Sequence, residues 1–431
     1  MANARKTTII WLMWWRRSRL ILKWLLVTAG FIVVVAPEWP AFQEERHRLQ
    51  TLVGLREFDF LTWELNALWE KGAAEAGDGH AYLDEGARTD VVLSYLELVA
   101  SAGRLEEEIR LLFADPEVAN PEIASRALRA ELATTRARMG QIQPLAETIV
   151  QEQVGSVLAE EGFAVLGEVW PPVQMRMTPL PEILIVSPRD EIRQKYNVPL
   201  VAGLTVPEQE TLEQGVYDHL NHSALVVPIG GLGLYPSMIV ETANINFLAD
   251  VVAHEWAHHW LTLHPVGVRY AANPAMRTIN ETTASIVGEE IGARVIERFY
   301  PEFVPPPEPE EAAEEEEAVP GTPPRFDFRV EMAITRVRVD ELLAEGRIEE
   351  AEAYMEDRRQ LFVENGYLIR KLNQAYFAFY GAYADTPGAA GSDPIGPAVL
   401  ALRERSRSLY AFMEQIAGVT AFEELETILA E

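Results

Sequence analysis

The length and composition of the chain are those of a globular protein with more than one domain. Its 431 residues are 48% hydrophobic and 24% charged, which is enough for two or three domains and a sizeable core. Acidic side chains outnumber basic ones by 66 to 37, and the net charge of -29 argues against a nucleic-acid-binding protein. The chain has no cysteine, so its fold needs no disulfides.

The first forty residues predict a membrane anchor preceded by a basic tail. Six basic residues come before the first acidic one, and residues 20–36, LILKWLLVTAGFIVVVA, are largely apolar and close to the shortest length that spans a bilayer. By the positive-inside rule the acidic remainder lies outside the cytoplasm, in a single-pass protein of the cell membrane. A cleaved secretory signal is the alternative, although Pro37, directly after the small residues Val34 and Ala36, would obstruct cleavage.

Residues 41–165 predict a helical domain. Apolar residues recur three and four positions apart in RTDVVLSYLELVASAGRLEEEIRLLF and PEIASRALRAELATTRARM, and DPE and NPE mark helix starts. The segment has no fixed repeat period that would indicate a repeat family. Its sequence assigns it no function.

Residues 166–300 change to short strands followed by helices, which predicts an α+β core. EILIVS, PLVAGL, ALVVPI and LYPSMIV are rich in branched residues and bounded by Pro, Gly or Asn, as strands are. PEQETLEQGVYDHL reads as a helix that opens on Pro207. We expect a small mixed sheet with LYPSMIV at its edge, because Pro236 cannot donate a ladder hydrogen bond.

The last two segments differ sharply in composition. Residues 301–325 form an acidic Pro/Glu-rich loop, in which seven glutamates between positions 308 and 317 predict a solvated segment. Residues 326–431 return to a helical pattern, interrupted by a loop at DTPGAAGSDPIGP. We therefore expect a C-terminal helical subdomain.

The stretch ADVVAHEWAHHWLTLHP, residues 249–265, contains four of the eight histidines and predicts a metal site. His254, Glu255 and His258 form the pattern H-E-x-x-H. On a helix, positions four apart differ by about 40° in direction, so both imidazoles can reach one ion while Glu255 lies beside it. A catalytic zinc takes three protein ligands and leaves a fourth position for water, whose proton Glu255 would accept during attack on a carbonyl.

Two residues compete for the third ligand position. His264 follows His258 by six residues, but Leu261 stands where the metzincin pattern H-E-x-x-H-x-x-G-x-x-H has its helix-breaking glycine. If the helix continues, His264 points about 120° away from His258. The other candidate is Glu281 in NETTAS. PVGVRYAANPAMRT supplies a turn, and a helix that begins near Asn280 would present Glu281 in its first turn.

With Glu281 as the third ligand, the pattern resembles that of the gluzincin metallopeptidases, the superfamily of thermolysin and the zinc aminopeptidases. The resemblance covers about residues 223–300. It implies a zinc ion bound by His254, His258 and Glu281, with Glu255 as the general base.

The resemblance also implies a substrate-binding strand and leaves two points open. The strand before the metal helix, residues 230–239, would pair with the substrate backbone. Ser285 stands where the thermolysin branch has an aspartate that supports a metal histidine, so Glu289 or Glu290 is expected to provide that hydrogen bond. The G-x-M-x-N sequence of the common zinc aminopeptidases is absent, so aminopeptidase and endopeptidase both remain open.

Gluzincins also supply a downstream Tyr or His that stabilises the oxyanion of the reaction intermediate. In RKLNQAYFAFYGAYAD, Asn373, Tyr376, Tyr380 and Tyr383 are three and four positions apart and so share one stripe of a helix. Tyr380 and Tyr383 are the candidates for this role. The alternative is that the stripe only packs, half-buried, against the core.

Together these features predict a membrane-anchored, zinc-dependent peptidase that acts on a peptide or protein substrate. The expected fold is α+β, a small mixed sheet whose edge strand packs on the H-E-x-x-H and glutamate helices, flanked by helical regions and preceded by a transmembrane helix. One alternative is a non-catalytic, membrane-anchored helical scaffold with a structural or vestigial zinc site. The other is a metzincin-like peptidase that uses His264.

Overall fold

The computed structural model describes residues 44–75, 83–114, 118–306, 326–383, 388–391 and 393–430. The chain forms two compact units, Met1–His47 and Arg48–Glu431, and apart from the first four residues of α2 the features below belong to the second. The predicted anchor and the acidic run at 308–317 lie outside the described residues. Among the helices of the described ranges, none combines the length and the apolar character that crossing a membrane requires. The α+β class predicted from the sequence is confirmed.

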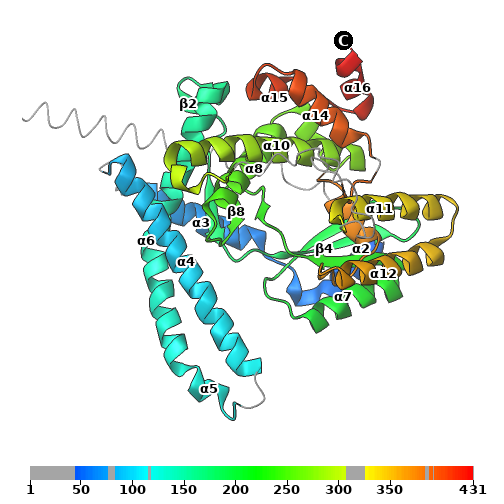
Figure 1. The fold of residues 1–431 in the computed structure, drawn as a ribbon, viewed down its shortest axis with the longest axis horizontal. Coiled ribbons are helices and arrows are strands. Elements are labelled where there is room, and N and C mark those ends of the chain that lie inside the picture. The colour runs from blue at the N-terminus through cyan, green and yellow to red at the C-terminus, as the bar shows by residue number, and fades with distance from the viewer. Residues whose placement is uncertain are drawn as a thin grey trace, which may run out of the picture. The chain divides into compact units, whose positions relative to one another are not determined.

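The region predicted to be helical contains a long helical hairpin. Its elements are α2 (Glu44–Val53), η1 (Gly54–Arg56), α3 (Phe60–Glu75), α4 (Glu85–Ala114), α5 (Pro121–Ala124), α6 (Arg126–Leu158) and the π-helical turn η3 (Ala159–Phe163). Figure 1 shows α4 and α6 side by side, joined through α5 at their far end. Buried Val92 and Leu96 of α4 and Ile149 and Val150 of α6 belong to one hydrophobic core, which holds the two helices together.

The strands form two separate three-stranded sheets and a short hairpin, rather than the single mixed sheet expected from the sequence. The bounds are β1 (Ala164–Val165), β2 (Glu168–Val169), β3 (Met175–Thr178), β4 (Glu182–Pro188), β5 (Tyr196–Leu200), β6 (His222–Val227), β7 (Gly231–Leu232) and β8 (Ser237–Val240). The first sheet has the order β5-β4-β6 and is antiparallel throughout. The second has the order β3-β8-β7, in which β3 and β8 are parallel and β7 is antiparallel.

The second sheet places β8 at its centre, so the expectation that LYPSMIV forms an edge strand was wrong. β8 pairs with β3 along its whole length and with β7 on its other side. Pro236 directly precedes β8, so its missing N–H removes no hydrogen bond from the ladder. One edge of this sheet is β7, and the other is β3.

Helix α6 covers the outer edge of β3. The side chain of Gln151 accepts a hydrogen bond from the backbone N–H of Met175 at 2.9 Å, and Glu147 accepts one from Met177 at 2.8 Å. Lys71 of α3 forms a buried ion pair with the same glutamate. Side chains therefore satisfy backbone donors that an edge strand would otherwise offer to another chain.

The first sheet lies between two sets of helices. Leu184 and Val186 of β4 pack into the cluster that contains residues of α2 and α7 (Val206–Leu220), whereas Ile183 and Ile185 pack against α13 (Gln374–Tyr380). Successive side chains of a strand point to opposite faces. Because both faces are covered, EILIVS is apolar at consecutive positions instead of alternating with polar residues.

The metal-motif helices form the centre of the largest hydrophobic core. The motif residues lie on α8 (Ile245–Thr262) and α10 (Pro274–Phe299), and α9 (Pro265–Val268) lies between these two helices. The helices that follow are η4 (Pro301–Phe303), α11 (Phe328–Ala344), α12 (Ile348–Glu364), α14 (Ile395–Arg405), α15 (Leu409–Ala417) and α16 (Phe422–Ala430). This core also includes residues of α4, α6, α14 and α15. The segments predicted as 41–165, 166–300 and 326–431 thus contribute to one core, and their status as separate domains stays a prediction.

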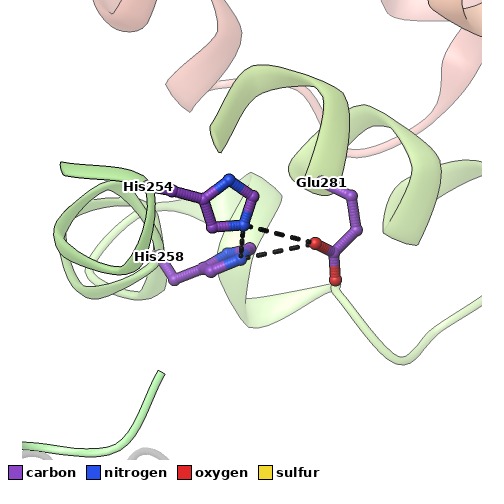
Figure 2. A group of neighbouring side chains, drawn as sticks. All are labelled: His254, His258 and Glu281. Atoms are coloured by element: carbon purple, nitrogen blue, oxygen red, sulfur yellow. Dashed lines mark hydrogen bonds and ion pairs between the residues drawn. The ribbon is translucent and has the colours of Figure 1, made fainter. Parts of the chain in front are cut away.

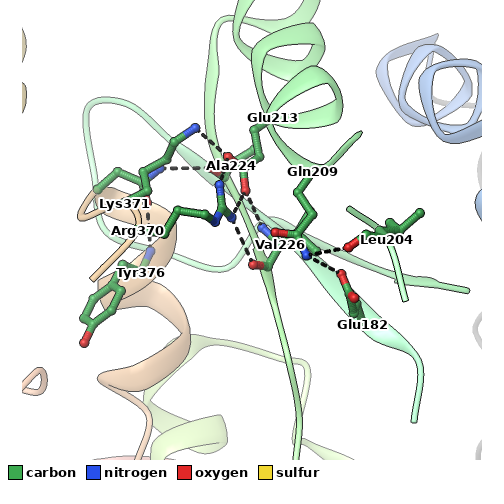
Figure 3. A network of polar contacts seen from close by, with 10 residues as sticks. Glu182, Leu204, Gln209, Glu213, Ala224, Val226, Arg370, Lys371 and Tyr376 are labelled. Atoms are coloured by element: carbon green, nitrogen blue, oxygen red, sulfur yellow. Dashed lines mark hydrogen bonds and ion pairs between the residues drawn. The ribbon is translucent and has the colours of Figure 1, made fainter. Parts of the chain in front are cut away.

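A buried carboxylate fixes the segment before α13 to the first sheet (Figure 3). Glu213 of α7 accepts hydrogen bonds from the backbone N–H of Val226 at 2.8 Å and from Arg370 and Lys371. Burial opposes the charge of Glu213, but the two cations outweigh it and hold its pKa below the usual value. The network therefore anchors the chain just ahead of the helix that leads to the candidate tyrosines.

Candidate metal centre

The sequence around the motif forms a long helix with both histidines on one face. Asn244 caps α8 by accepting hydrogen bonds from the backbone N–H groups of Asn246 and Phe247. The opposite, apolar side of the helix is buried in the core. As expected for positions one turn apart, the Nε2 atoms of His254 and His258 converge and lie 3.1 Å from each other.

Glu281 completes a triangle with the two histidines (Figure 2). Its Oε2 atom lies 3.4 Å from Nε2 of His258 and 3.8 Å from Nε2 of His254. Ligand atoms about 2.05 Å from a tetrahedral zinc ion lie about 3.3 Å from one another. The three separations bracket that value, so the triangle has the dimensions of a three-ligand zinc site.

The expected helix for Glu281 exists, but it starts earlier than its sequence predicts. Asn273 caps α10 and Pro274 occupies its first turn, so the helix does not begin near Asn280. Glu281 consequently lies about two turns inside the helix, seven residues after its first residue. A position within the helix orients the carboxylate more firmly than a first turn would, because intrahelical hydrogen bonds hold both neighbouring turns.

His258 and Glu281 shift each other's protonation. Burial opposes a charge on His258, but the Glu281 carboxylate outweighs it and raises the pKa of His258 to about 9. Burial also works against an ionised Glu281, yet His258, His254 and Arg277 hold its pKa well below the usual value. Glu281 is therefore a carboxylate at neutral pH, which is the form that binds a metal.

Asn280 supports one of the candidate metal histidines. Its Oδ1 atom lies 2.7 Å from Nδ1 of His258, which donates the hydrogen bond, so that Nε2 is the ring nitrogen directed at the triangle. The expectation for Glu290 was wrong, because its carboxylate binds Arg403. Glu289 is exposed. The sequence signal for this support was the asparagine adjacent to the glutamate ligand.

Two glycines bring α10 close enough to α8 for its carboxylate to reach the histidines. A Cβ atom on Gly288 would lie 3.1 Å from Cβ of His254 and would overlap the side chain of Asp250. On Gly292 it would lie 2.9 Å from the backbone of Asp250. Contacts of this kind need residues without a side chain, and the spacing G-x-x-x-G in GEEIG was the sequence signal for them.

Glu255 lies beside the triangle, under the edge strand β7. It is 5% exposed, and its Oε2 atom is buried without a hydrogen-bond partner. Burial raises its pKa above the usual value, while His258 and His254 oppose the shift. A Cβ atom on Gly231 would overlap this carboxylate, and one on Gly233 would lie 3.4 Å from Oε2. The glycines of GGLG therefore let the strand pass directly over the candidate base.

A buried histidine fixes the loop after β7 to the motif helix. Nε2 of His259 donates to the backbone oxygen of Leu234 at 2.6 Å and lies 3.3 Å from the hydroxyl of Ser237. Burial lowers the pKa of His259 to about 3, so its ring is neutral at physiological pH. The third histidine of HEWAHH thus positions the edge strand and is not part of the metal triangle.

Replacing Gly231 by alanine is expected to lower the free energy of unfolding by about 1–3 kcal/mol, the usual effect of overpacking. The added Cβ must displace either β7 or the Glu255 carboxylate. Urea denaturation measures the change. Gly140→Ala is the control, because a Cβ there meets nothing within 4 Å, and alanine is expected to stabilise helix α6 by about 0.5–1 kcal/mol. Equal stability of Gly231→Ala and the wild type would contradict the close approach.

The structure brings Tyr383 to the triangle. Its ring stacks on His254 with a centroid separation of 6.4 Å and an interplanar angle of 28°. Burial is the main cause that raises its pKa well above the usual value, so the phenol keeps its proton. Tyr380 instead packs on Tyr376 and Phe379. The predicted helical stripe is only partly right, because α13 ends at Tyr380 and Tyr383 lies in the turn beyond it.

His264 is held away from the triangle. Helix α8 ends at Thr262, and the backbone turns so that His264 precedes α9. Its ring stacks on Trp260 at 3.8 Å, and Nδ1 donates to the backbone oxygen of Trp260 at 2.8 Å. It lines a separate pocket of about 610 Å³ together with Tyr410 and Glu414. This geometry does not support the metzincin-like ligand set.

Tyr270 and Arg277, for which the sequence predicts only a turn, also contact the site. The hydroxyl of Tyr270 donates to Oε1 of Glu281, and Nε of Arg277 donates to the same hydroxyl at 3.3 Å. No spacing rule links these residues to H-E-x-x-H, because the contact depends on how the chain folds back between α8 and α10.

No protein-family profile, curated protein or solved structure matches the chain. The chemistry of the site therefore has to be inferred from its own geometry.

Proposed function

We propose that the protein is a zinc-dependent peptidase. The observation that carries the proposal is the convergence of His254, His258 and Glu281, with the buried Glu255 carboxylate beside them, one oxygen of which lacks a hydrogen-bond partner. Three ligands suit a catalytic zinc, which keeps one position open, whereas a structural zinc is normally closed by four. A structural site would also have no use for Glu255, which argues against the scaffold alternative.

The residues around the site have distinct roles in peptide hydrolysis. The chemistry that a zinc ion supplies at such a site is Lewis-acid polarisation of the scissile carbonyl and acidification of the attacking water. Glu255 accepts the proton of that water and delivers it to the leaving amine. Tyr383, beside His254 and protonated, donates a hydrogen bond to the developing oxyanion. Tyr380 packs against Tyr376 and Phe379 and takes no part in the reaction.

The substrate backbone pairs with the edge strand β7. The opposite edge of the sheet is covered by Gln151 and Glu147, whereas β7 crosses directly over Glu255. Gly231 and Gly233 have no side chains that would hold a second chain away from the site. An extended peptide added to β7 would therefore carry its scissile carbonyl past the catalytic carboxylate.

The peptidase is anchored to the cell membrane through residues 20–36, with its acidic bulk on the extracytoplasmic side. Its substrate is a peptide or protein. The net charge of -29 favours basic peptides by electrostatic steering, which physiological salt screens within about 8 Å. The same charge argues against a nucleic-acid partner.

Chelation tests the proposal directly. The full-length protein in detergent is incubated with a peptide mixture, before and after removal of metal with a chelator and after addition of zinc. Cleavage is expected to fall by on the order of 10³-fold on chelation, since the ion supplies several kcal/mol of transition-state stabilisation, and to return with zinc. Cleavage that persists in protein shown to be metal-free, or no cleavage by zinc-loaded protein, would overturn the proposal.

A further inference from the structure

Tyr270 connects two of the three metal-triangle residues from outside both helices. It lies in the segment between α9 and α10, where its hydroxyl donates to Oε1 of Glu281. Its ring also meets the ring of His258 edge-on, with centroids 6.3 Å apart and an interplanar angle of 88°. A single side chain thus contacts a carboxylate ligand through a hydrogen bond and an imidazole ligand through its ring.

The direction of the hydrogen bonds around Tyr270 is determined by Arg277. A guanidinium group has donors only, so its Nε–H can only donate to the phenol oxygen. The phenol has one proton, so its hydroxyl donates its single hydrogen bond to Glu281. Arg277 is itself held in place, because its Nη1 atom donates to the backbone oxygen of Ala378 in α13 at 2.7 Å. The hydrogen bonds therefore run in one direction, from Arg277 to Tyr270 and from Tyr270 to Glu281.

This arrangement distinguishes the two oxygens of the glutamate. Oε1 is occupied by Tyr270, whereas Oε2 faces the histidine Nε2 atoms and has no hydrogen-bond partner although it is buried. A free carboxylate can bind a metal through one oxygen or through both. If both oxygens of Glu281 bound, the second would compete for the coordination position that a catalytic site keeps open.

We propose that Tyr270, oriented by Arg277, is a positioning residue that restricts Glu281 to binding metal through Oε2 alone and thereby keeps a coordination position free. This inference rests on the proposed function, since it assumes that the triangle binds zinc. Arg277 also connects α10 to α13 through its hydrogen bond to Ala378. The same series of hydrogen bonds therefore links Glu281 to the segment that ends near Tyr383.

The test compares Tyr270→Phe with a matched tyrosine variant away from the metal triangle. Tyr270→Phe removes only the hydroxyl. Tyr300, directly after α10, is buried, and its hydroxyl donates to Gln153 at 2.7 Å, so Tyr300→Phe removes one phenol hydrogen bond away from the metal triangle. Zinc affinity of the full-length proteins is measured by competition with a chelating dye. We expect zinc to bind Tyr270→Phe about 10–100-fold more weakly, as for other outer partners of ligands, and Tyr300→Phe as tightly as the wild type.

A cobalt spectrum separates a change in coordination from a loss of stability. At saturating Co²⁺, the visible absorption of Tyr270→Phe is expected to weaken, because a second oxygen from Glu281 raises the coordination number above four. Arg277→Gln, which leaves the phenol proton free to rotate, is expected to shift the spectrum in the same direction.

Three results would overturn the inference, and they are distinguishable. Unchanged zinc affinity and an unchanged cobalt spectrum in Tyr270→Phe would refute the positioning role while leaving the proposed function intact. Equal losses of zinc affinity in Tyr270→Phe and Tyr300→Phe would show that the hydroxyl of Tyr270 only stabilises the fold. Absence of zinc binding in the wild type would overturn both the inference and the proposed function.

Discussion

Replacing Glu255 by glutamine is expected to lower kcat/KM for peptide cleavage by about 10²- to 10⁴-fold, the usual contribution of a general base. The amide keeps the size of the side chain but cannot accept the proton of the attacking water. Zinc should remain bound, because His254, His258 and Glu281 are unchanged. Steady-state kinetics and elemental mass spectrometry of the same preparations measure both quantities.

The stability of this variant provides an independent check on the role of Glu255. A carboxylate that is 5% exposed and lacks a partner for one oxygen is costly to bury, so glutamine is expected to leave the melting temperature unchanged or to raise it. Glu297→Gln, on the exposed side of α10, serves as the control for the substitution itself. Unchanged cleavage by Glu255→Gln would refute the catalytic role, and loss of zinc would indicate that Glu255 shapes the metal site instead.

Replacing Glu281 by alanine is expected to weaken zinc binding by more than the roughly 10–100-fold that loss of an outer partner causes, because a direct ligand disappears. Only His254 and His258 then remain, with their Nε2 atoms 3.1 Å apart, and two ligands do not form a catalytic zinc site. The measurement is zinc per chain after dialysis against a weak chelator. His254→Ala and His258→Ala should give the same result.

His264→Ala is the matched comparison for the metal ligands. Its imidazole stacks on Trp260 and hydrogen-bonds to the backbone of that residue, so the variant should retain one zinc per chain and lose only local packing. If zinc were lost with His264→Ala and kept with Glu281→Ala, the ligand set would be that of a metzincin-like enzyme. In that case the position of Glu281 beside the two histidines would have no bearing on metal binding.

The pattern H-E-x-x-H was sufficient to predict two ligands and the candidate base, because helical periodicity alone places positions four apart on one face. The choice of Glu281 over His264 also followed from local features, namely Leu261 in place of a helix-breaking glycine and a turn-rich segment before NETTAS. The helix start was misplaced because the Asn273–Pro274 pair, a strong start signal, was assigned to the turn.

Contacts between distant segments could not be predicted in the same way. Parallel pairing of β8 with β3 joins strands about sixty residues apart, and this pairing made β7 the edge strand. Tyr383 reaches His254 because the Glu213 network fixes the chain ahead of α13, and because the backbone turns after Tyr380. Neither condition leaves a periodic trace in the sequence.

The sequence by itself determined the α+β class, the helix with its two histidines and candidate base, and the glutamate that joins them, because each depends on the residues of one element. Only the tertiary structure decided which oxygen of Glu281 faces the histidines, which residues orient the candidate ligands and which strand lies at the edge of the second sheet. These features depend on how closely α10 approaches α8 at Gly288 and on where the loop carrying Tyr270 returns. Packing between elements sets both distances, and no local pattern encodes them.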